Sequence, residues 1–346
     1  MDIYTVASNA MVTIHMHSVL IGNGVHLKGD LVSRRVFVPK VDRPIPTATG
    51  EGECIKLEET EGPCNIWSLG ITPIKVDKLI SLLKNYADQN TAKELAEGFQ
   101  FGFRLGYEGP RIGGETTNLK SVSDHLDETK SKIQSEVELG RISGPFDSKP
   151  ITNLRVSPIG LVPKADAKWR LITHLSFPDN QGVNHFIDPD KCSVTYTSLD
   201  QALELITTMG KRTQLAKMDV KSAFRLLIIH PGDFDLLGFK FEGKYYIDKC
   251  LPMGCAMSCC LFEKFATFLQ WELERRTGLD TVFHYLDDFL FLGHAGSDEC
   301  TRLMEGFTDL SDHIGLPLAH DKTVGPATKI VFLGLEIDTD DMVVRI

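Results

Sequence analysis

The spacing of apolar residues divides the chain into three parts. Residues 1–70 show no sustained period, so an irregular extension is expected there. Over residues 71–139 apolar side chains recur every three or four positions, which predicts amphipathic helices. Over residues 140–346 short apolar runs alternate with turn residues and with a few helical stretches, which predicts a domain of mixed strands and helices.

The helical part offers three apolar faces. They are formed by Val76, Leu79, Ile80 and Leu83, by Leu95, Ala96, Phe99 and Phe103, and by Ile133 and Val137. The glycine-rich stretch 102–109 lies between the second face and the third. It lacks the Gly-Lys-Ser/Thr ending of a phosphate-binding loop, so the end of a helix explains it better.

The third part predicts hairpins and capped helices in a fixed order. Strands are expected over 157–162, 169–173, 214–220 and 330–337, with a hairpin over 238–246. Helices are expected between a capping box at Ser198 and a stop at Gly210, between a cap at Ser258 and Gly278, and from Leu303 to Gly315.

Two acidic residues, Asp287 and Asp288, stand side by side in an otherwise apolar run. The flanking runs 282–285 and 289–292 are typical of buried strands, so the acidic pair is expected at the turn of a hairpin. Carboxylates beside Phe and Leu would take up protons unless a cation neutralised them, which favours a bound divalent metal. A solvated turn is the alternative, because Asp-Asp is common in loops.

The composition limits the cellular compartments and the classes of binding partner that are expected for this protein. The 346 residues are 42% hydrophobic and 24% charged, which is enough for a substantial core. The net charge of −10 argues against nucleic-acid binding through bulk charge, so a polynucleotide would need a local basic channel or bound metals. No run approaches the roughly 18 apolar residues of a membrane span, and the start lacks a signal peptide. We therefore expect an intracellular protein, nuclear or cytoplasmic, without a membrane partner.

The eight cysteines carry no sign of a metal site. They form neither a Cys-x-x-Cys pair nor a Cys/His cluster at zinc spacing. Reduced thiols are expected, and Cys255, Cys259 and Cys260 are expected to fill core positions.

The order of the remaining motifs resembles that of the reverse transcriptase family, from about Gly140 to Asp338. The matching stretches are Asp219-Val-Lys-Ser-Ala-Phe224 for the first palm motif, Leu251-Pro-Met-Gly254 for the second, Tyr285-Leu-Asp-Asp288 for the third, 315–323 for the fourth and Phe332-Leu-Gly334 for the primer-contacting motif. Within the family, Gly144-Pro-Phe146, Ser157 to Pro163, Ala223-Phe224-Arg225 and His284 to Leu290 most resemble DIRS-type retroelements, whose transposition uses a tyrosine recombinase.

The resemblance implies an α+β fold with the fingers and palm of a right-hand polymerase. In that fold an antiparallel palm sheet packs on helices, and here a helical N-terminal extension would precede it. The fingers and palm would occupy residues 140–346. Because the sequence stops at Ile346, soon after Phe332-Leu-Gly334, the helical thumb of the family is expected to be missing or truncated.

The resemblance also implies a site for two Mg²⁺ ions, with Mn²⁺ as an alternative. Asp219 and Asp287 would be metal ligands and catalytic residues, assisted by the Val220 carbonyl, and Asp288 would be a supporting carboxylate. Nucleotide addition suits such a site, because one metal activates the attacking 3′-hydroxyl while the other stabilises the leaving group. Carboxylates from two strands can bracket two ions about 4 Å apart.

Other matching residues would hold the incoming nucleotide. Lys164 and Arg170 would bind the triphosphate, because the lysine ammonium is a compact charge and the planar arginine guanidinium can donate two hydrogen bonds to phosphate oxygens. The alternative is that both are solvated cations of a turn. Phe224, after Ala223, would lie under the sugar and exclude a 2′-hydroxyl, which predicts a preference for deoxynucleotides. A Phe at this position also suits a core, and both roles are compatible.

Three further positions have expected roles. Gly254 would allow the backbone to approach the base and template. Met253 stands where viral members commonly have Gln, so weaker nucleotide affinity or processivity is expected. Lys322 would donate a proton to pyrophosphate. The alternative interpretation is an ordinary surface lysine at a turn.

The sequence thus predicts an RNA-directed DNA polymerase, a nucleotidyltransferase of retrotransposon origin. Its partners would be an RNA or DNA template with a primer, and dNTPs. The alternative is a truncated, catalytically weak or inactive derivative of such an enzyme that binds nucleic acid or protein. The expected absence of a thumb favours that alternative, because fewer phosphate contacts would hold the duplex.

Overall fold

The structure of the chain is a computed structural model. It describes residues 66–164, 169–196 and 198–345, all of which belong to one compact unit from Glu61 to Ile346. The irregular extension predicted for residues 1–70 lies almost entirely outside the described residues, and so does most of the turn after Lys164. In the described part of the chain, no helix is long and apolar enough to cross a membrane.

The helices follow the apolar periods of the sequence closely. They are α2 (Val76–Leu83), α3 (Gln89–Phe101), α4 (Lys120–Asp124), α5 (Leu126–Glu138), α6 (Pro189–Cys192), α7 (Leu199–Met209), α8 (Met257–Thr277) and α9 (Glu299–Ile314), with 3-10 turns η1 (Val183–Phe186), η2 (Ala223–Leu226), η3 (Pro231–Leu236) and η4 (His320–Lys322). The capping box of Ser198 and Gln201 is present, and Gly210, Gly278 and Gly315 end their helices as predicted. Gly102 likewise ends α3, so the glycine-rich stretch is a helix end.

The strands form several small sheets. They are β1 (Gly114–Glu115), β2 (Ile142–Phe146), β3 (Arg155–Val156), β4 (Ile159–Pro163), β5 (Trp169–Thr173), β6 (Gln214–Asp219), β7 (Gly238–Phe241), β8 (Lys244–Asp248), β9 (Val282–Tyr285), β10 (Asp288–Gly293), β11 (Val324–Ala327), β12 (Lys329–Phe332), β13 (Leu335–Asp338) and β14 (Val343–Arg345). Their orders are β1-β3-β7-β8-β2, β11-β6-β10-β9, β12-β13-β14 and β4-β5.

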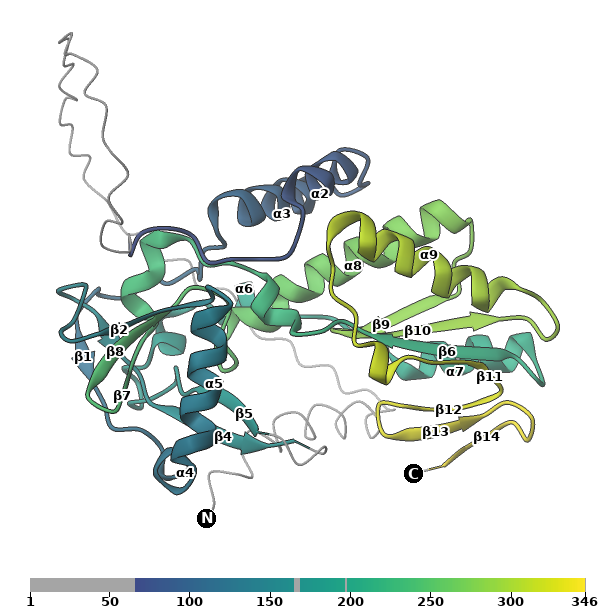
Figure 1. Cartoon of the computed structure of the whole chain (residues 1–346). Coiled ribbons are helices and arrows are strands. Elements are labelled where there is room, and N and C mark those ends of the chain that lie inside the picture. Colours follow the sequence, from purple (N-terminus) through teal and green to yellow (C-terminus); the bar gives the residue numbers. More distant parts are fainter. Residues whose placement is uncertain (1–65, 165–168, 197, 346) are drawn as a thin grey trace, which may run out of the picture. The chain divides into compact units, whose positions relative to one another are not determined.

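The sheet β11-β6-β10-β9 separates two hydrophobic cores. Alternate residues of β6 and β10 point to opposite faces, as strand geometry requires. Ala216, Met218, Phe289 and Phe291 pack in the larger core with α8 and α9, which lie along one face of the sheet in Figure 1. On the opposite face, Leu215, Leu290 and Leu292 pack with apolar residues of α7, β12 and β13.

The N-terminal helices share the larger core. Leu79 and Leu83 of α2 and Leu95 and Phe99 of α3 are buried in the same cluster as Phe289 of the central sheet. Phe99 packs against Phe265 of α8, with ring centroids 4.9 Å apart. The apolar faces of α2 and α3 therefore bury against α8 and the central sheet.

The structure corrects three local predictions. The stretch 330–337 is not one strand, because Leu333 and Gly334 have φ of +49° and +83° and turn β12 back into β13. Ser258 does not cap α8. The helix already begins at Met257, and the Ser258 hydroxyl donates to the carbonyl of Pro252 at 2.9 Å. Phe103 lies outside α3, although it is buried beneath it.

A buried charge cluster fixes the turn that follows β6. Arg225 of η2 donates to Oε2 of Glu136 at 2.9 Å and to both carboxylate oxygens of Asp248 at 2.7 and 2.8 Å. Burial raises the pKa of Asp248, and the charge of Arg225 opposes that shift. This arginine thus joins η2 to α5 and to the end of β8.

We expect Arg225→Met to lower the free energy of unfolding by about 3 to 5 kcal/mol, because it leaves Asp248 buried without its cation. Urea denaturation measures the loss. The double variant Arg225→Met/Asp248→Asn should be more stable than the single variant, since Asp248 then no longer buries an uncompensated charge. Equal stability of the two variants would contradict this explanation.

Candidate functional site

Asp219 and Asp288 face each other across two neighbouring strands. Asp219 ends β6 and Asp288 begins β10, and the two residues are direct partners in the antiparallel register. They belong to the same face of the sheet as Leu215, Leu290 and Leu292. Only 8% of Asp219 is exposed. Like charges directly opposite each other destabilise a sheet, so this pairing requires a compensating cation or a bound proton.

Asp287 is brought to the same place by a two-residue turn. Tyr285 pairs with Asp288, which leaves Leu286 and Asp287 as the turn between β9 and β10. Leu286 has φ of +54° and is buried, so its side chain anchors the turn. The backbone N–H of Val220 donates to the carbonyl of Asp287 at 2.9 Å. The hairpin predicted from sequence is confirmed, except that Asp288 is the first strand residue rather than part of the turn.

Burial and mutual repulsion make the acidic pair hard to ionise. Burial is the largest cause that raises the pKa of Asp288 to about 7, followed by the charges of Asp287 and Asp219. Burial also raises the pKa of Asp287, again with Asp219 contributing, whereas Lys322 and Arg170 lower it. The site therefore favours any cation that can approach all three carboxyl groups.

In this structure the nearest described cation is the ammonium of Lys322. Its Nζ lies 2.7 Å from Oδ2 of Asp219. Burial lowers the pKa of Lys322, but the hydrogen bond to Asp219 and the charges of all three carboxylates outweigh this and raise it. The backbone supports the contact, since the N–H of Ala319 donates to the carbonyl of Asp219 at 2.8 Å.

The donor chemistry suits a hard divalent ion, although Asp219 is already paired with an ammonium. Mg²⁺ prefers carboxylate and carbonyl oxygens, which this cluster supplies. Among the described residues, no group of three or more His, Cys, Asp or Glu side chains is arranged as a metal-ligand set. Burial and the neighbouring carboxylates, which raise the pKa of Asp287 and of Asp288, nevertheless favour positive charge at this point. Asp219, Asp287 and Asp288 are therefore the residues that could hold a metal.

The candidate triphosphate residues come from the β4-β5 hairpin. Arg170 lies on β5, is half-buried, and is close enough to lower the pKa of Asp287. Lys164 is exposed directly after β4, and the rest of the turn lies outside the described residues. The structure thus brings Arg170 toward the carboxyl cluster.

Phe224 packs against the larger core from the turn that follows β6. It lies on η2, just after β6, and Ala223 before it is buried. The half-buried Phe224 ring packs edge-to-face on Phe262 of α8, with centroids 5.9 Å apart. This contact fixes the ring next to the strand that carries Asp219.

The Met253-Gly254 turn is locked to the end of β5. Gly254 has φ of +112°, and a Cβ at this position would lie 2.1 Å from the carbonyl oxygen of Thr173. The N–H of Thr173 donates to the carbonyl of Met253 at 2.9 Å. The close approach of Thr173 therefore requires glycine at position 254, independently of any contact of this turn with a nucleotide or template.

Sequence reasoning missed two residues that shape this region. Asn184 donates to the carbonyl of Gly254 at 2.8 Å and accepts from the N–H of Ala256 at 2.9 Å, so it holds the turn before α8. Tyr196 packs on Tyr285, with ring centroids 4.6 Å apart. An isolated Asn or Tyr in a loop gives no periodic or motif signal, and only the folded chain reveals these contacts.

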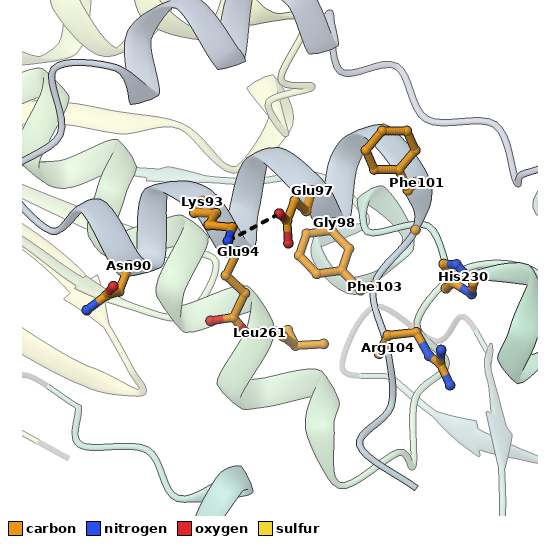
Figure 2. Close-up of a pocket in the computed structure, with 11 residues that line it drawn as sticks. Asn90, Lys93, Glu94, Glu97, Gly98, Phe101, Phe103, Arg104, His230 and Leu261 are labelled. Atoms are coloured by element: carbon orange, nitrogen blue, oxygen red, sulfur yellow. Dashed lines mark ion pairs between the residues drawn. The ribbon is translucent and has the colours of Figure 1, made fainter. Parts of the chain in front are cut away.

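A separate pocket lies on another part of the unit. It has a volume of about 580 Å³ and lies between α3 and the segment that follows it (Figure 2). Glu97 and Phe101 of α3, Arg104, His230 and Leu261 are among its lining residues. It shares no residue with the carboxyl cluster.

Comparisons with known proteins agree with the family resemblance. A family model described as "Reverse transcriptase (RNA-dependent DNA polymerase)" matches residues 162–337, just over half of the chain. The chain is 28% identical over 156 residues to the genome polyprotein of Petunia vein clearing virus, which covers 45% of this chain and 7% of the polyprotein. It is 32% identical over 122 residues to Protein P of Duck hepatitis B virus (strain China), which covers 35% of this chain and 15% of that protein.

Solved structures extend the likeness to most of the chain. The foamy viral protease-reverse transcriptase in complex with double-stranded DNA is similar with a TM-score of 0.52 and 18% identity, over 76% of this chain and 46% of that one. A second structure of that protein with double-stranded DNA gives a TM-score of 0.51, over 78% and 56% of the two chains. At this identity the likeness shows the fold, which is the mixed α/β fingers and palm of a polymerase.

The chain matches only a small part of the curated viral proteins and about half of the solved ones. Within that part, the matched family region includes Asp219, Asp287, Asp288 and Arg170. The chain belongs to the reverse transcriptase (RNA-dependent DNA polymerase) family.

Proposed function

We propose that this chain is an RNA-directed DNA polymerase that adds dNTPs to a primer 3′-hydroxyl by two-metal phosphoryl transfer. The observation that carries the proposal is the direct pairing of Asp219 with Asp288, with Asp287 in the adjoining turn. Such a pairing is costly unless cations are part of the working site. Membership of the reverse transcriptase family supports it.

Each side chain then has a defined task. Asp219 and Asp287 hold Mg²⁺ or Mn²⁺ together with the Val220 carbonyl, and Asp288 adds negative charge beside them. Bound metals supply activation of the attacking hydroxyl and stabilisation of the leaving pyrophosphate. Arg170 binds the triphosphate with Lys164, and the Lys322 ammonium donates a proton to the departing pyrophosphate. Met253 and Gly254 line the nucleotide position.

The proposal extends to the origin and the partners of the chain. The motif phrases around Gly144, Ser157 and His284 support a DIRS-type retrotransposon source within the family. A primed RNA or DNA template is the proposed partner. The relatives with solved structures are described in complexes with double-stranded DNA, which supports duplex binding by the shared fold.

A second candidate function is a non-catalytic derivative that binds nucleic acid or protein. The observation that favours it is the ion pair of Lys322 with Asp219, because an ammonium contacts the carboxylate that a metal would need. In a working polymerase this lysine must leave Asp219 when metal binds. In the non-catalytic derivative it would remain there.

We expect primer extension on poly(A) with oligo(dT), Mg²⁺ and dTTP, and expect Asp287→Asn to abolish it. Loss of a metal-binding carboxylate removes the charge that holds the ions. The matched control is Asp312→Asn, which changes an exposed acid on α9 and should retain full incorporation. A folded wild-type sample that binds duplex but incorporates nothing would favour the non-catalytic derivative.

Mg²⁺ binding should become stronger as the pH rises from 6 to 8. The pKa of Asp288 is raised to about 7, so below that pH the carboxyl is largely neutral and must release a proton before it can attract the metal. The thermal shift produced by a fixed Mg²⁺ concentration, measured at both pH values, checks this. The shift in Asp288→Asn should depend much less on pH. Equal shifts in the wild type at pH 6 and pH 8 would oppose a metal at these carboxyls.

Phe224→Ala should weaken discrimination against ribonucleotides by about tenfold or more, because space for the 2′-hydroxyl opens beside the sugar. Competition between rNTP and dNTP in primer extension gives the ratio of kcat/KM values. Phe177→Ala removes an exposed aromatic ring outside the site and serves as the control. Unchanged discrimination in folded Phe224→Ala protein would leave Phe224 with its core role alone.

A further inference from the structure

A buried histidine lies beneath the hairpin that carries Asp287 and Asp288. His284 is on β9, one residue before Tyr285, and only 4% of it is exposed. Its ring stacks on Phe289 of β10, its direct cross-strand partner, with centroids 5.4 Å apart and an interplanar angle of 24°. Phe289 is in turn packed on Phe307 of α9. The histidine is thus built into the base of the hairpin.

Both ring nitrogens of His284 face oxygen atoms from α8. Nδ1 lies 2.6 Å from Oε1 of Gln270, and Nε2 lies 3.2 Å from Oε1 of Glu263. The amide orientation is fixed by its other end, because Nε2 of Gln270 donates to Glu274 at 2.7 Å. Gln270 therefore presents its carbonyl oxygen, which can only accept, so Nδ1 of His284 carries a hydrogen.

The contact with Glu263 requires a second proton. If Nε2 were unprotonated, its lone pair would face a carboxylate oxygen in a buried place, which is repulsive. An imidazolium removes the repulsion and gives the buried Glu263 its counter-charge. The pair interacts through charge rather than through a well-directed hydrogen bond, since among the described residues Nε2 of His284 and Oε2 of Glu263 have no hydrogen-bond partner.

Among the described residues, no Lys or Arg side chain forms an ion pair with Glu263. The side chain of Glu263 is about 10% exposed. Its negative charge contributes to the raised pKa values of Tyr196, Tyr285 and Cys259. On the other side of the ring, the charge of His284 lowers the pKa of Glu274, although burial dominates and raises it overall.

We propose that Glu263 and His284 form a buried carboxylate–imidazolium pair that positions the acidic hairpin on α8. Both are positioning residues, since neither would touch the nucleotide. The pair fixes β9 three residues before Asp287 and, through Phe289, fixes β10 next to Asp288. The effect on nucleotide addition rests on the proposed function. The charge pair itself does not, so it can be tested without activity.

The first test observes the protons of His284 directly. Nitrogen-15 NMR of the ring, assigned with His284→Gln, should show both nitrogens protonated in the wild type at pH 7. In Glu263→Gln the same ring should lose one proton at that pH, because its counter-charge has gone. A neutral ring in the wild type would overturn the proposal, whether or not the protein polymerises DNA.

The second test is a double-mutant cycle with Glu263→Gln, His284→Gln and the combined variant. His284→Gln leaves Glu263 buried without its counter-charge, and Glu263→Gln removes the charge that keeps the His284 ring protonated. In each single variant kcat for dTTP addition should therefore fall by about tenfold, with KM for dTTP within about twofold. The combined variant should recover most of the loss, because neither charge remains. Additive losses would overturn the pairing.

Urea denaturation of the same four proteins gives a readout without activity, and its midpoints should show the same recovery. The chain offers a matched control in His294 and Glu299, a pair nearer the surface whose Nδ1 and Oε2 atoms are 2.7 Å apart. His294→Gln and Glu299→Gln should change kcat by less than about twofold and show no coupling. Wild-type protein without incorporation would refute the proposed function, while the NMR and unfolding results would still decide the charge pair.

Discussion

The structure of the site depends on the cross-strand pairing of two aspartates at the end of a buried sheet. The two-residue turn at Leu286 and Asp287 sets the pairs along β9 and β10, and the pairing of β6 with β10 places Asp219 opposite Asp288. A shift of one residue would turn Phe289 and Phe291 away from the larger core. The hydrophobic pattern of the hairpin therefore holds two like charges together against their repulsion.

The rest of the fold supplies positive charge to that point from separate parts of the sequence. Lys322 comes from the turn after α9, and Arg170 comes from the β4-β5 hairpin, which is attached to the palm through Thr173 and Gly254. Both side chains lower the pKa of Asp287. Charge interactions thus couple the β9-β10 hairpin, the β4-β5 hairpin and the turn that carries Lys322, which are far apart in the sequence. The burial of the carboxyl groups strengthens these interactions because the local dielectric is low.

The sequence predicted the elements better than the contacts between them. Amphipathic periods located α2, α3, α7 and α9, and the acidic run located the β9-β10 hairpin, because side-chain spacing reflects burial directly. Local signals failed where backbone geometry decided, as at Leu333 and Gly334, or where a helix began without its predicted cap at Ser258. The contacts of Asn184, Tyr196 and Lys322 depend on long-range packing, so no window of sequence contains them. The roles of the site residues came from family resemblance and remain predictions.

Buried charges contact the acidic hairpin and its partner strand on both faces of the central sheet. Lys322 balances Asp219, which belongs to the same face of the sheet as Leu290 and Leu292, whereas His284 lies on the face that packs against α8. An apolar residue at His284 would leave Glu263 without a counter-charge, and a neutral residue at Glu263 alone would remove the charge that keeps the imidazole protonated. Packing alone tolerates small shifts of a hairpin, but a buried ion pair loses much of its energy when its partners separate. A hairpin that must present carboxylates at fixed positions gains more from the second kind of contact than from additional apolar area.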